Sequence, residues 1–585
     1  MMMMWQGLEN QSAVCLTPTN GLVGDKNPAK FHLRIPTIQA PSMKYLALGF
    51  FFFSVVSSGL PVVDGSSPTC LQSARFPDLY EASIRDLEEG LDRGDFTSVD
   101  LVTAYLKRID QVNVNGAGLR AVLEVNPRAL ERAAALDIER MSGNKRSALH
   151  GIPILVKDNI ATSADEGMNT TAGSYALLGS VVPGDATVVK KLRKAGAIIL
   201  GKTNLSEWSY FRDFGLDSGW SGRGGQATNP YYPRADPCGS SAGSGVATAV
   251  GLAAGSLGTE TDGSIICPSS YNNLVGIKPT VGLTSRTGVI PVTYRQDTVG
   301  PMTRSVTDAA IILSVIAGYD PSDNYTKTAP HSIPDYTRAL KLGALKGKRI
   351  GVPRAVFMND FFTGNHPSIN IEFDKALDTI RSLGGIVVDH VYLPSATKAP
   401  RFIWDIELPF FKIDFKIDLN RYLKRSIGSQ ETHGYNSTYF TALEDKFRLG
   451  REEGIDAALL EYDLDALILP SNGLTTNIAA IAGYPIVTVP LGFHPDDTVL
   501  GTTGAFPNAG DHTVFPAPGV PFGLSFLGTA YSEFDLVGYA YAYEQVTHTR
   551  LKRRAYPSAI PSAQLESIVA VCPKGHPLVA QGVLL

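Results

Sequence analysis

At 585 residues, with 44% hydrophobic and 18% charged residues, the chain has the composition of a globular protein with a large core. Its 52 basic and 56 acidic residues give a net charge of −4, which indicates neither nucleic acid nor a membrane surface as a partner. Glycine and proline are frequent but not periodic, so collagen-like and repeat architectures are excluded.

The first 70 residues differ from the rest of the chain. Residues 1–42 show no sustained hydrophobic period, and we interpret them as a disordered tail or a stretch that is not translated. Met43-Lys44, an apolar run to Val56 and the small residues 57–59 form the pattern of a secretory signal peptide, placed at 43–59. A membrane anchor is the alternative, but the run falls short of the about 20 apolar residues that a span needs. We expect a secreted protein whose translation starts at Met43.

Four cysteines remain once this leader is removed. Cys70 and Cys572 flank the body of the chain, and a bridge between them is an open prediction. For Cys238 and Cys267 we expect plain buried thiols. Three sequons would carry glycans in a secreted protein, and they begin at Asn169, Asn324 and Asn436.

From Leu79 onward, helical and strand patterns alternate. Thr97 or Ser98 caps a helix that runs past Ile109 at helical spacing, and a buried strand from Gly151 ends at Lys157. Further strands are expected at 119–125, 197–200, 349–352, 385–388, 467–469, 486–489 and 523–527, and further helices from Pro127, at 186–194 and at 532–552. The alternation predicts one α/β domain over 71–560 with its sheet covered on both faces, and a C-terminal tail at 561–585.

Two segments rich in small residues stand out. Asp236-Pro-Cys-Gly-Ser240-Ser241-Ala-Gly-Ser-Gly245 can place hydroxyls and backbone N–H groups at a helix N-terminus. Gly258-Thr-Glu-Thr-Asp-Gly-Ser264 has the pattern of a strand that breaks into a tight loop presenting Ser264. Each segment alone is typical of an ordinary loop.

Their combination with Gly151-Ile-Pro-Ile-Leu-Val-Lys157-Asp-Asn159 and Gly276-Ile-Lys-Pro-Thr280 resembles the amidase signature family. The similarity extends more loosely from about residue 79 to about residue 556. It implies a single α/β/α domain around a large mixed sheet, carrying a Ser–Ser–Lys triad. By position, the resemblance makes Ser264 the nucleophile, Ser240 the bridging serine and Lys157 the base. The oxyanion hole would consist of the backbone N–H groups of Thr261, Asp262 and Gly263.

This chemistry is physically reasonable. A serine hydroxyl becomes a good nucleophile only when a base removes its proton. Lysine can be that base only when neutral, so its pKa must fall from about 10.4 to the neutral range. Burial at the end of the apolar strand 151–156 disfavours the ammonium and can supply such a fall in pKa. Because the histidines are scattered without ligand spacing, we expect no metal and no cofactor.

The chain departs from the common family pattern at two positions. Asp262 stands where a glycine is usual, and Glu260 replaces an aspartate; aspartate tolerates left-handed backbone, so the loop can still form. The variant resembles the branch of peptide amidases and related fungal and plant amidases. In the family the bridging serine follows a cis peptide, so we expect Gly239–Ser240 to be cis. The sequon at Asn204 should be buried.

Other readings remain. Gly239-Ser-Ser241-Ala-Gly243 also fits the nucleophile elbow of an α/β-hydrolase esterase, with Ser241 as nucleophile and His494, His512 or His548 downstream, but no strand precedes it. A catalytically silent binding protein on the same fold should lack a triad member, and all three are present. The ammonia-releasing subunit of transfer-RNA amidation works with intracellular partners, which the leader disfavours.

We therefore predict hydrolysis of a carboxylic amide other than a peptide bond, in a small molecule or an amidated peptide, with release of ammonia or an amine. The sequence leaves the substrate open. Pocket walls are sought among aromatic and loop residues that are more often core, namely Trp208, Tyr210, Trp220, 402–411 and 498–520.

Overall fold

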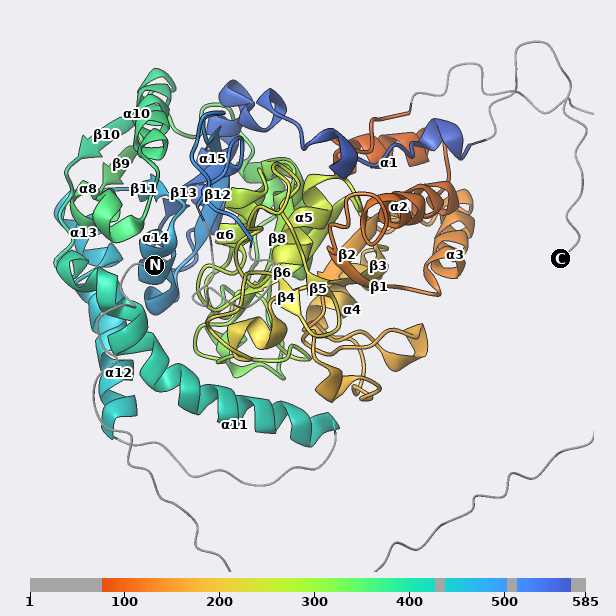
Figure 1. Ribbon diagram of the computed structural model, residues 1–585, viewed down its shortest axis with the longest axis horizontal. Helices are drawn as coiled ribbons and strands as arrows, with labels where there is room; N and C mark the ends of the chain where they lie inside the picture. Colours follow the sequence, from red (N-terminus) through yellow and green to blue (C-terminus); the bar gives the residue numbers. More distant parts are fainter. Residues whose placement is uncertain (1–75, 427–436, 502–512, 570–585) are drawn as a thin grey trace, which may run out of the picture. The chain divides into compact units, whose positions relative to one another are not determined.

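The computed structural model describes residues 76–426, 437–501 and 513–569 (Figure 1). The predicted leader, the Cys70–Cys572 bridge, His512 and the Asn436 sequon lie outside the described residues. Among the helices that are described, none combines the length and apolar character that a bilayer span needs.

An eleven-stranded mixed sheet forms the centre of the domain. Its strand order is β1-β3-β2-β6-β8-β7-β12-β13-β11-β9-β10. The strands are β1 (Val122–Val125), β2 (Pro153–Lys157), β3 (Ile198–Thr203), β6 (Gly255–Glu260), β7 (Val275–Lys278), β8 (Thr298–Thr303), β9 (Arg349–Val352), β10 (Ile386–Asp389), β11 (Ala466–Pro470), β12 (Ile486–Phe493) and β13 (Pro521–Leu527). A separate two-stranded ribbon pairs β4 (Trp220–Ser221) with β5 (Gly225–Gln226).

Helices lie around this sheet (Figure 1). Their bounds are α1 (Ile84–Arg93), α2 (Ser98–Val112), α3 (Ala129–Met141), α4 (Thr187–Lys194), α5 (Ala242–Ala249), α6 (Ile266–Tyr271), α7 (Val306–Ile316), α8 (Arg354–Phe357), α9 (Asp360–Thr363), α10 (Pro367–Ser382), α11 (Leu408–Ser426), α12 (Ser437–Phe447), α13 (Ile455–Glu461), α14 (Gly473–Ala482) and α15 (Glu533–Thr547). The expected α/β/α domain around a mixed sheet is confirmed.

The core shows why both faces of the sheet need helices. Along β11, Ala466 and Ile468 belong to one apolar cluster, whereas Leu467 and Leu469 belong to a second. Because successive strand residues point to opposite faces, each face of β11 is buried under its own helical layer. The first cluster includes side chains of α10 and α15, and the second those of α13 and α14.

Most predicted elements are present, with shifted ends. Thr97 caps α2 in a capping box with Asp100, as the sequence indicates. The last helix ends earlier than predicted, because His548 adopts a left-handed backbone (φ 44°) after α15 and a 3₁₀ turn takes over. The predicted tail is also shorter: Arg108 of α2 donates to the carbonyl of Ala563 at 2.6 Å, and Leu565 is fully buried. The domain therefore includes residues 561–569.

The strand directions place the functional segments together. β2 runs parallel to β6, with Val156 opposite Leu257, so both strands end at the same edge of the sheet. Lys157 is the last residue of β2, and the loop that follows β6 carries Ser264. The carboxyl ends of parallel strands form a common site in α/β folds, and the chemistry should be sought at this edge.

Candidate active site

Lys157 is fully buried at the end of β2. Its Nζ donates to Ser240 Oγ at 2.7 Å and to Thr259 Oγ1 at 2.9 Å, and it lies 3.3 Å from the Thr259 carbonyl. Asn159 Nδ2 donates to the same threonine hydroxyl at 3.0 Å and so holds it in place. The amine is surrounded by neutral hydrogen-bonding groups, and within the described residues it forms no ion pair.

Burial sets the protonation state of this amine. It lowers the pKa of Lys157 to about 7, and the negative charges of Asp297 and Glu260 offset only part of the effect. A substantial fraction of the amine is therefore neutral near pH 7, as a base in this position requires.

The two predicted serines come from different segments and meet beside this lysine. Ser240 is fully buried just before α5, while Ser264, in the loop before α6, keeps 8% of its surface exposed. The Ser240 N–H donates to Ser264 Oγ at 3.3 Å, and the Ser241 N–H donates to the Ser264 carbonyl at 3.2 Å. Ser240 thus touches both Lys157 and Ser264, and only Ser264 of the three is open to solvent to any extent.

The loop from Thr261 to Gly263 carries the predicted oxyanion donors. Gly263 has φ 73°, so the left-handed position falls on the glycine and Asp262 needs no such conformation. The backbone N–H of Asp262 has no partner in the described parts of the chain, which leaves it available to a ligand. The Gly263 N–H lies against the Glu260 carboxylate, so Asp262 offers the freer donor.

Buried carboxyls fix the two ends of this loop. Glu260 Oε2 accepts the N–H groups of Ile265 and Ile266 at 2.6 and 2.8 Å. Asp297 Oδ1 accepts the Thr261 hydroxyl at 2.6 Å, and burial raises the pKa of Asp297 to about 6. Sequence reasoning noticed Glu260 only as a departure from the family pattern, and it missed Thr259 and Asp297 altogether.

Two expectations about the segment before Ser240 are wrong. Cys238 and Cys267 are joined by a disulfide and are not free thiols, because the fold brings their Cα atoms to 5.6 Å. The Gly239–Ser240 peptide is trans, and a positive φ at both Cys238 (57°) and Gly239 (61°) makes the sharp turn. The bridge links the segment two residues before Ser240 to the helix three residues after Ser264.

Ser241, the nucleophile of the elbow reading, has a structural position. It is fully buried. Its Oγ donates to the Thr259 carbonyl at 3.0 Å and accepts a hydrogen bond from the Thr259 N–H at 3.3 Å. Of its proposed histidine partners, His494 packs against Phe515 and Phe522, and its ring nitrogens have no hydrogen bond within the described residues. The esterase reading loses its support.

The segment that contacts Ser240 through Ser206 continues into aromatic residues. The Ser206 N–H donates to the Ser240 carbonyl at 3.1 Å, and the residues that follow, Trp208 to Tyr210, all have positive φ. That strained run presents Trp208 and Phe211 to Phe415 of α11, with ring centroids 6.3 and 4.5 Å apart. By contrast Phe402, Phe410 and Phe411 are core residues, and Trp220 lies in the β4–β5 ribbon. The Asn204 side chain nearby is fully buried, as expected for that sequon.

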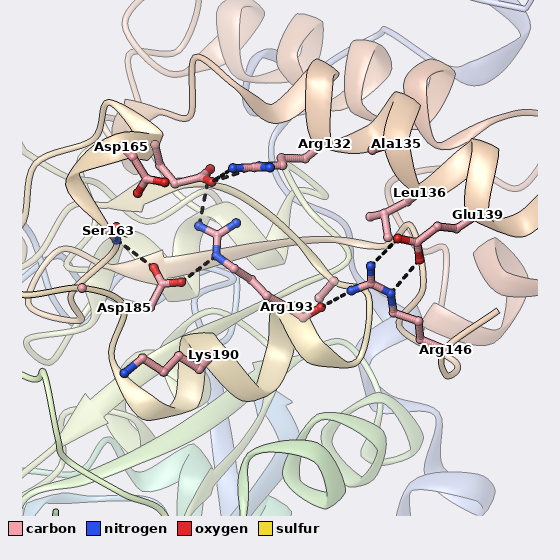
Figure 2. A pocket seen from close by; sticks show the side chains of 13 residues that line it. Arg132, Ala135, Leu136, Glu139, Arg146, Ser163, Asp165, Asp185, Lys190 and Arg193 are labelled. Atoms are coloured by element: carbon pink, nitrogen blue, oxygen red, sulfur yellow. Dashed lines mark hydrogen bonds and ion pairs between the residues drawn. The ribbon is translucent and has the colours of Figure 1, made fainter. Parts of the chain in front are cut away.

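A hollow of about 560 Å³ lies apart from the triad, between α3 and the segment that leads into α4 (Figure 2). Most of its charged side chains pair with each other: Arg132 and Arg193 with Glu166, Arg193 with Asp185, and Arg146 with Glu139. These pairs leave little charge to attract a ligand. Within the described residues, no cluster of His, Cys, Asp and Glu could hold a metal ion.

Comparisons with known proteins agree on one group. The family model described as "Amidase" matches residues 100–472. A probable amidase of Arabidopsis thaliana is 39% identical, over 86% of this chain and 98% of that protein. The native peptide amidase structure from Stenotrophomonas maltophilia has a TM-score of 0.70 and 41% identity, covering 81% of this chain and 98% of that one. A glutamyl-tRNA(Gln) amidotransferase subunit from Thermosynechococcus vestitus is 33% identical, over 79% of this chain and 98% of that protein.

The disulfide should carry a measurable share of stability. It closes a loop of 29 residues, for which chain entropy predicts a loss of about 3–4 kcal/mol in the free energy of unfolding when the bridge is removed. We expect the double variant Cys238→Ser/Cys267→Ser to unfold at lower urea concentration and to be much less sensitive to reductant than the parent protein. A Cys70→Ser/Cys572→Ser variant is the control. If reductant destabilises the double variant as much as the parent protein, a different bridge is responsible.

Proposed function

This chain belongs to the amidase family, and we propose that it hydrolyses carboxylic amides through an acyl-enzyme on Ser264. The observation that carries the proposal is the 2.7 Å hydrogen bond from the buried Lys157 amine to Ser240 Oγ, together with the 3.3 Å hydrogen bond from the Ser240 backbone N–H to Ser264 Oγ. A buried lysine with a pKa of about 7 is a competent base, whereas an exposed lysine is not.

The proposed reaction uses the triad twice. Neutral Lys157 takes the Ser240 proton while Ser240 takes that of Ser264, whose Oγ attacks the amide carbonyl. The proton then returns through Ser240 to the leaving nitrogen, and the C–N bond breaks to release ammonia or an amine. Water attacks the ester on Ser264 by the same route and frees the acid. The backbone N–H groups of the 261–263 loop, Asp262 above all, would stabilise the oxyanion in both halves.

One feature supports a substrate with an apolar group, and a second bears on the type of reaction. Trp208 and Phe211 are half-buried against Phe415, and they follow Ser206, which donates to the Ser240 carbonyl, so their rings are candidates to cover apolar substrate surface. Over about four fifths of the chain, identity is 41% to the peptide amidase and 33% to the amidotransferase subunit of Thermosynechococcus vestitus. We therefore favour linear amides, including C-terminally amidated peptides, over glutamine-dependent transfer.

Secretion remains part of the proposal. It is supported by the sequence pattern at 43–59 and by the disulfide, because such bridges persist in oxidising compartments. Asn324 is exposed and would accept a glycan there, while Asn169 is partly buried and donates to Glu124.

Replacing the nucleophile tests the assignment directly. We expect Ser264→Ala to lower kcat on an amide substrate by at least about 1,000-fold while the melting temperature stays near that of the parent, because only the attacking oxygen is lost. Ser241→Ala is the matched control. It should lose stability through its Thr259 contacts and still turn over substrate. The reverse pattern would restore the elbow reading.

The role of Lys157 as a base is tested by a variant that keeps the positive charge but cannot give up its proton. Lys157→Arg should be inactive to within about 0.1% of the parent kcat, because arginine stays protonated at every working pH. In the parent, kcat/KM should rise as pH increases through the Lys157 pKa of about 7, since the neutral amine is the active form. The exposed Lys190→Arg serves as control. Near-parental kcat in Lys157→Arg would reduce Lys157 to a source of positive charge.

Export is tested on the full chain in a secreting eukaryotic host. The N-terminus of protein from the medium should lie just after Ser58 or Gly59, and sequencing or intact mass will show it. Intact Met1 or Met43 on an intracellular product would contradict secretion without affecting the amidase assignment.

A further inference from the structure

A second group of buried acids lies behind the oxyanion loop and takes no part in the proposed proton path. Glu407, at the end of the π-helical turn Ile403–Glu407, is fully buried and meets the side chain of Asp262. Single π-helical turns occur often at functional sites, where they direct a side chain that a regular helix would place elsewhere.

Each of the two carboxyls has one oxygen engaged by an amide. Asn477 Nδ2 donates to Asp262 Oδ2, and Gln296 Nε2 donates to Glu407 Oε1 at 2.7 Å. The other two oxygens, Asp262 Oδ1 and Glu407 Oε2, are buried and have no hydrogen-bond partner among the described residues. The Thr476 hydroxyl lies against Asp262, but it donates to the Gly473 carbonyl at 3.0 Å. Two adjoining carboxylates cannot both be charged in such a setting, because a buried acceptor without a donor and a like-charge contact are both strongly unfavourable.

One proton resolves both problems. We propose that Glu407 is a positioning residue, which stays protonated and donates from Oε2 to Oδ1 of Asp262, and so holds the oxyanion loop in place. The inference rests on the proposed amide hydrolysis and deepens it. The same Gln296 amide also lies 3.2 Å from the Thr261 carbonyl, so these hydrogen bonds contact the loop at both Thr261 and Asp262.

The surrounding charges fit this assignment. Burial and the neighbouring Asp262 raise the pKa of Glu407 well above its ordinary range, while burial raises that of Asp262 to about 7, with Glu260 adding to the rise. The glutamate therefore keeps the proton and the aspartate accepts. Lys446 of α12 also faces Glu407, but burial lowers its pKa and its Nζ donates to the Arg295 carbonyl. Lys278 acts on Asp262 and Glu260 only through charge.

The function of the pair follows from its position. Asp262 carries one of the backbone N–H groups that would meet the oxyanion and that have no partner in the described parts of the chain, and its side-chain contacts fix the direction of that N–H. Preorganised donors stabilise a transition state only when their direction is fixed beforehand. A glycine, which is usual at this position in the family, has no side chain to be held in this way. In this chain the Asp262 side chain therefore restricts a backbone that a glycine would leave free.

Infrared difference spectra of the folded protein test the shared proton without requiring turnover. At about pH 9, where ordinary carboxyls are ionised, the parent-minus-Glu407→Gln spectrum should contain the C=O stretch of one protonated carboxylic acid. The parent-minus-Asp262→Asn spectrum should contain it too, because the asparagine amide then donates and Glu407 ionises. The proposal is overturned if the first spectrum lacks the band. It is also overturned if the second spectrum lacks it, because Glu407 would then stay protonated without Asp262.

Kinetics test the positioning role. On an amide that the parent hydrolyses, Glu407→Met should lower kcat by about 10- to 100-fold with KM changed less than about three-fold, because a transition-state donor is loosened. Glu407→Gln, which can still donate to Asp262, should recover most of that loss. Asp405→Asn, on the same π-helical turn but paired with Arg401 at the surface, should leave kcat unchanged. Equal kcat in the Met and Gln variants, at melting temperatures near the parent value, would refute the role, whereas an inactive parent refutes the proposed function alone.

Discussion

The proposed active site depends on burying one amine without a counter-ion in contact. Lys157 Nζ is in contact with two hydroxyls and a carbonyl, while the nearest acids act on it only from a distance. The ammonium is therefore disfavoured in the fold. Because the folded-state pKa of about 7 lies below the unfolded value of about 10.4, the unfolded chain binds more protons between these pH values. The contribution of Lys157 to stability consequently rises with pH across that window and is least favourable below it. This loss of stability falls near pH 7, where Lys157 would act as the proposed base.

The resemblance to the amidase signature family proposed Lys157, Ser240 and Ser264 as a triad, and the structure brings these three residues together. Lys157 ends an apolar strand, and Ser264 follows a strand that breaks at Gly263. β9 was predicted to the residue, since its apolar run is bounded on both sides. Element ends shifted where a single residue adopted an unusual backbone, as His548 does after α15. No propensity scale anticipates a left-handed histidine, because tertiary packing selects it.

What the sequence could not supply are contacts between distant segments. The disulfide joins cysteines 29 positions apart, and each thiol alone has the pattern of a core residue. Asp297 and Glu407 reach the oxyanion loop from far along the chain, 36 positions beyond Thr261 in the case of Asp297, so no short motif contains them. The trans Gly239–Ser240 peptide is a similar case. The turn is made by two positive φ angles in place of a cis bond, and the residue types permit either solution.

These long-range contacts converge on the relative placement of two serines. Ser240 is held by Ser206, by the disulfide at Cys238 and by Lys157, whereas Ser264 is held by the Glu260 hydrogen bonds and by the other end of the same disulfide. Lysine has a long side chain with several rotatable bonds, so it can act as a precise base only if its partner is fixed more firmly than it is. A buried serine anchored on both sides meets that requirement. The small residues around Ser240 follow from it, since Gly243 lies so close to the backbone of Asn204 that a Cβ there would be 2.5 Å from its nitrogen. The glycine- and serine-rich composition of this segment is thus the steric condition for bringing Lys157 and the proposed nucleophile Ser264 to the same serine.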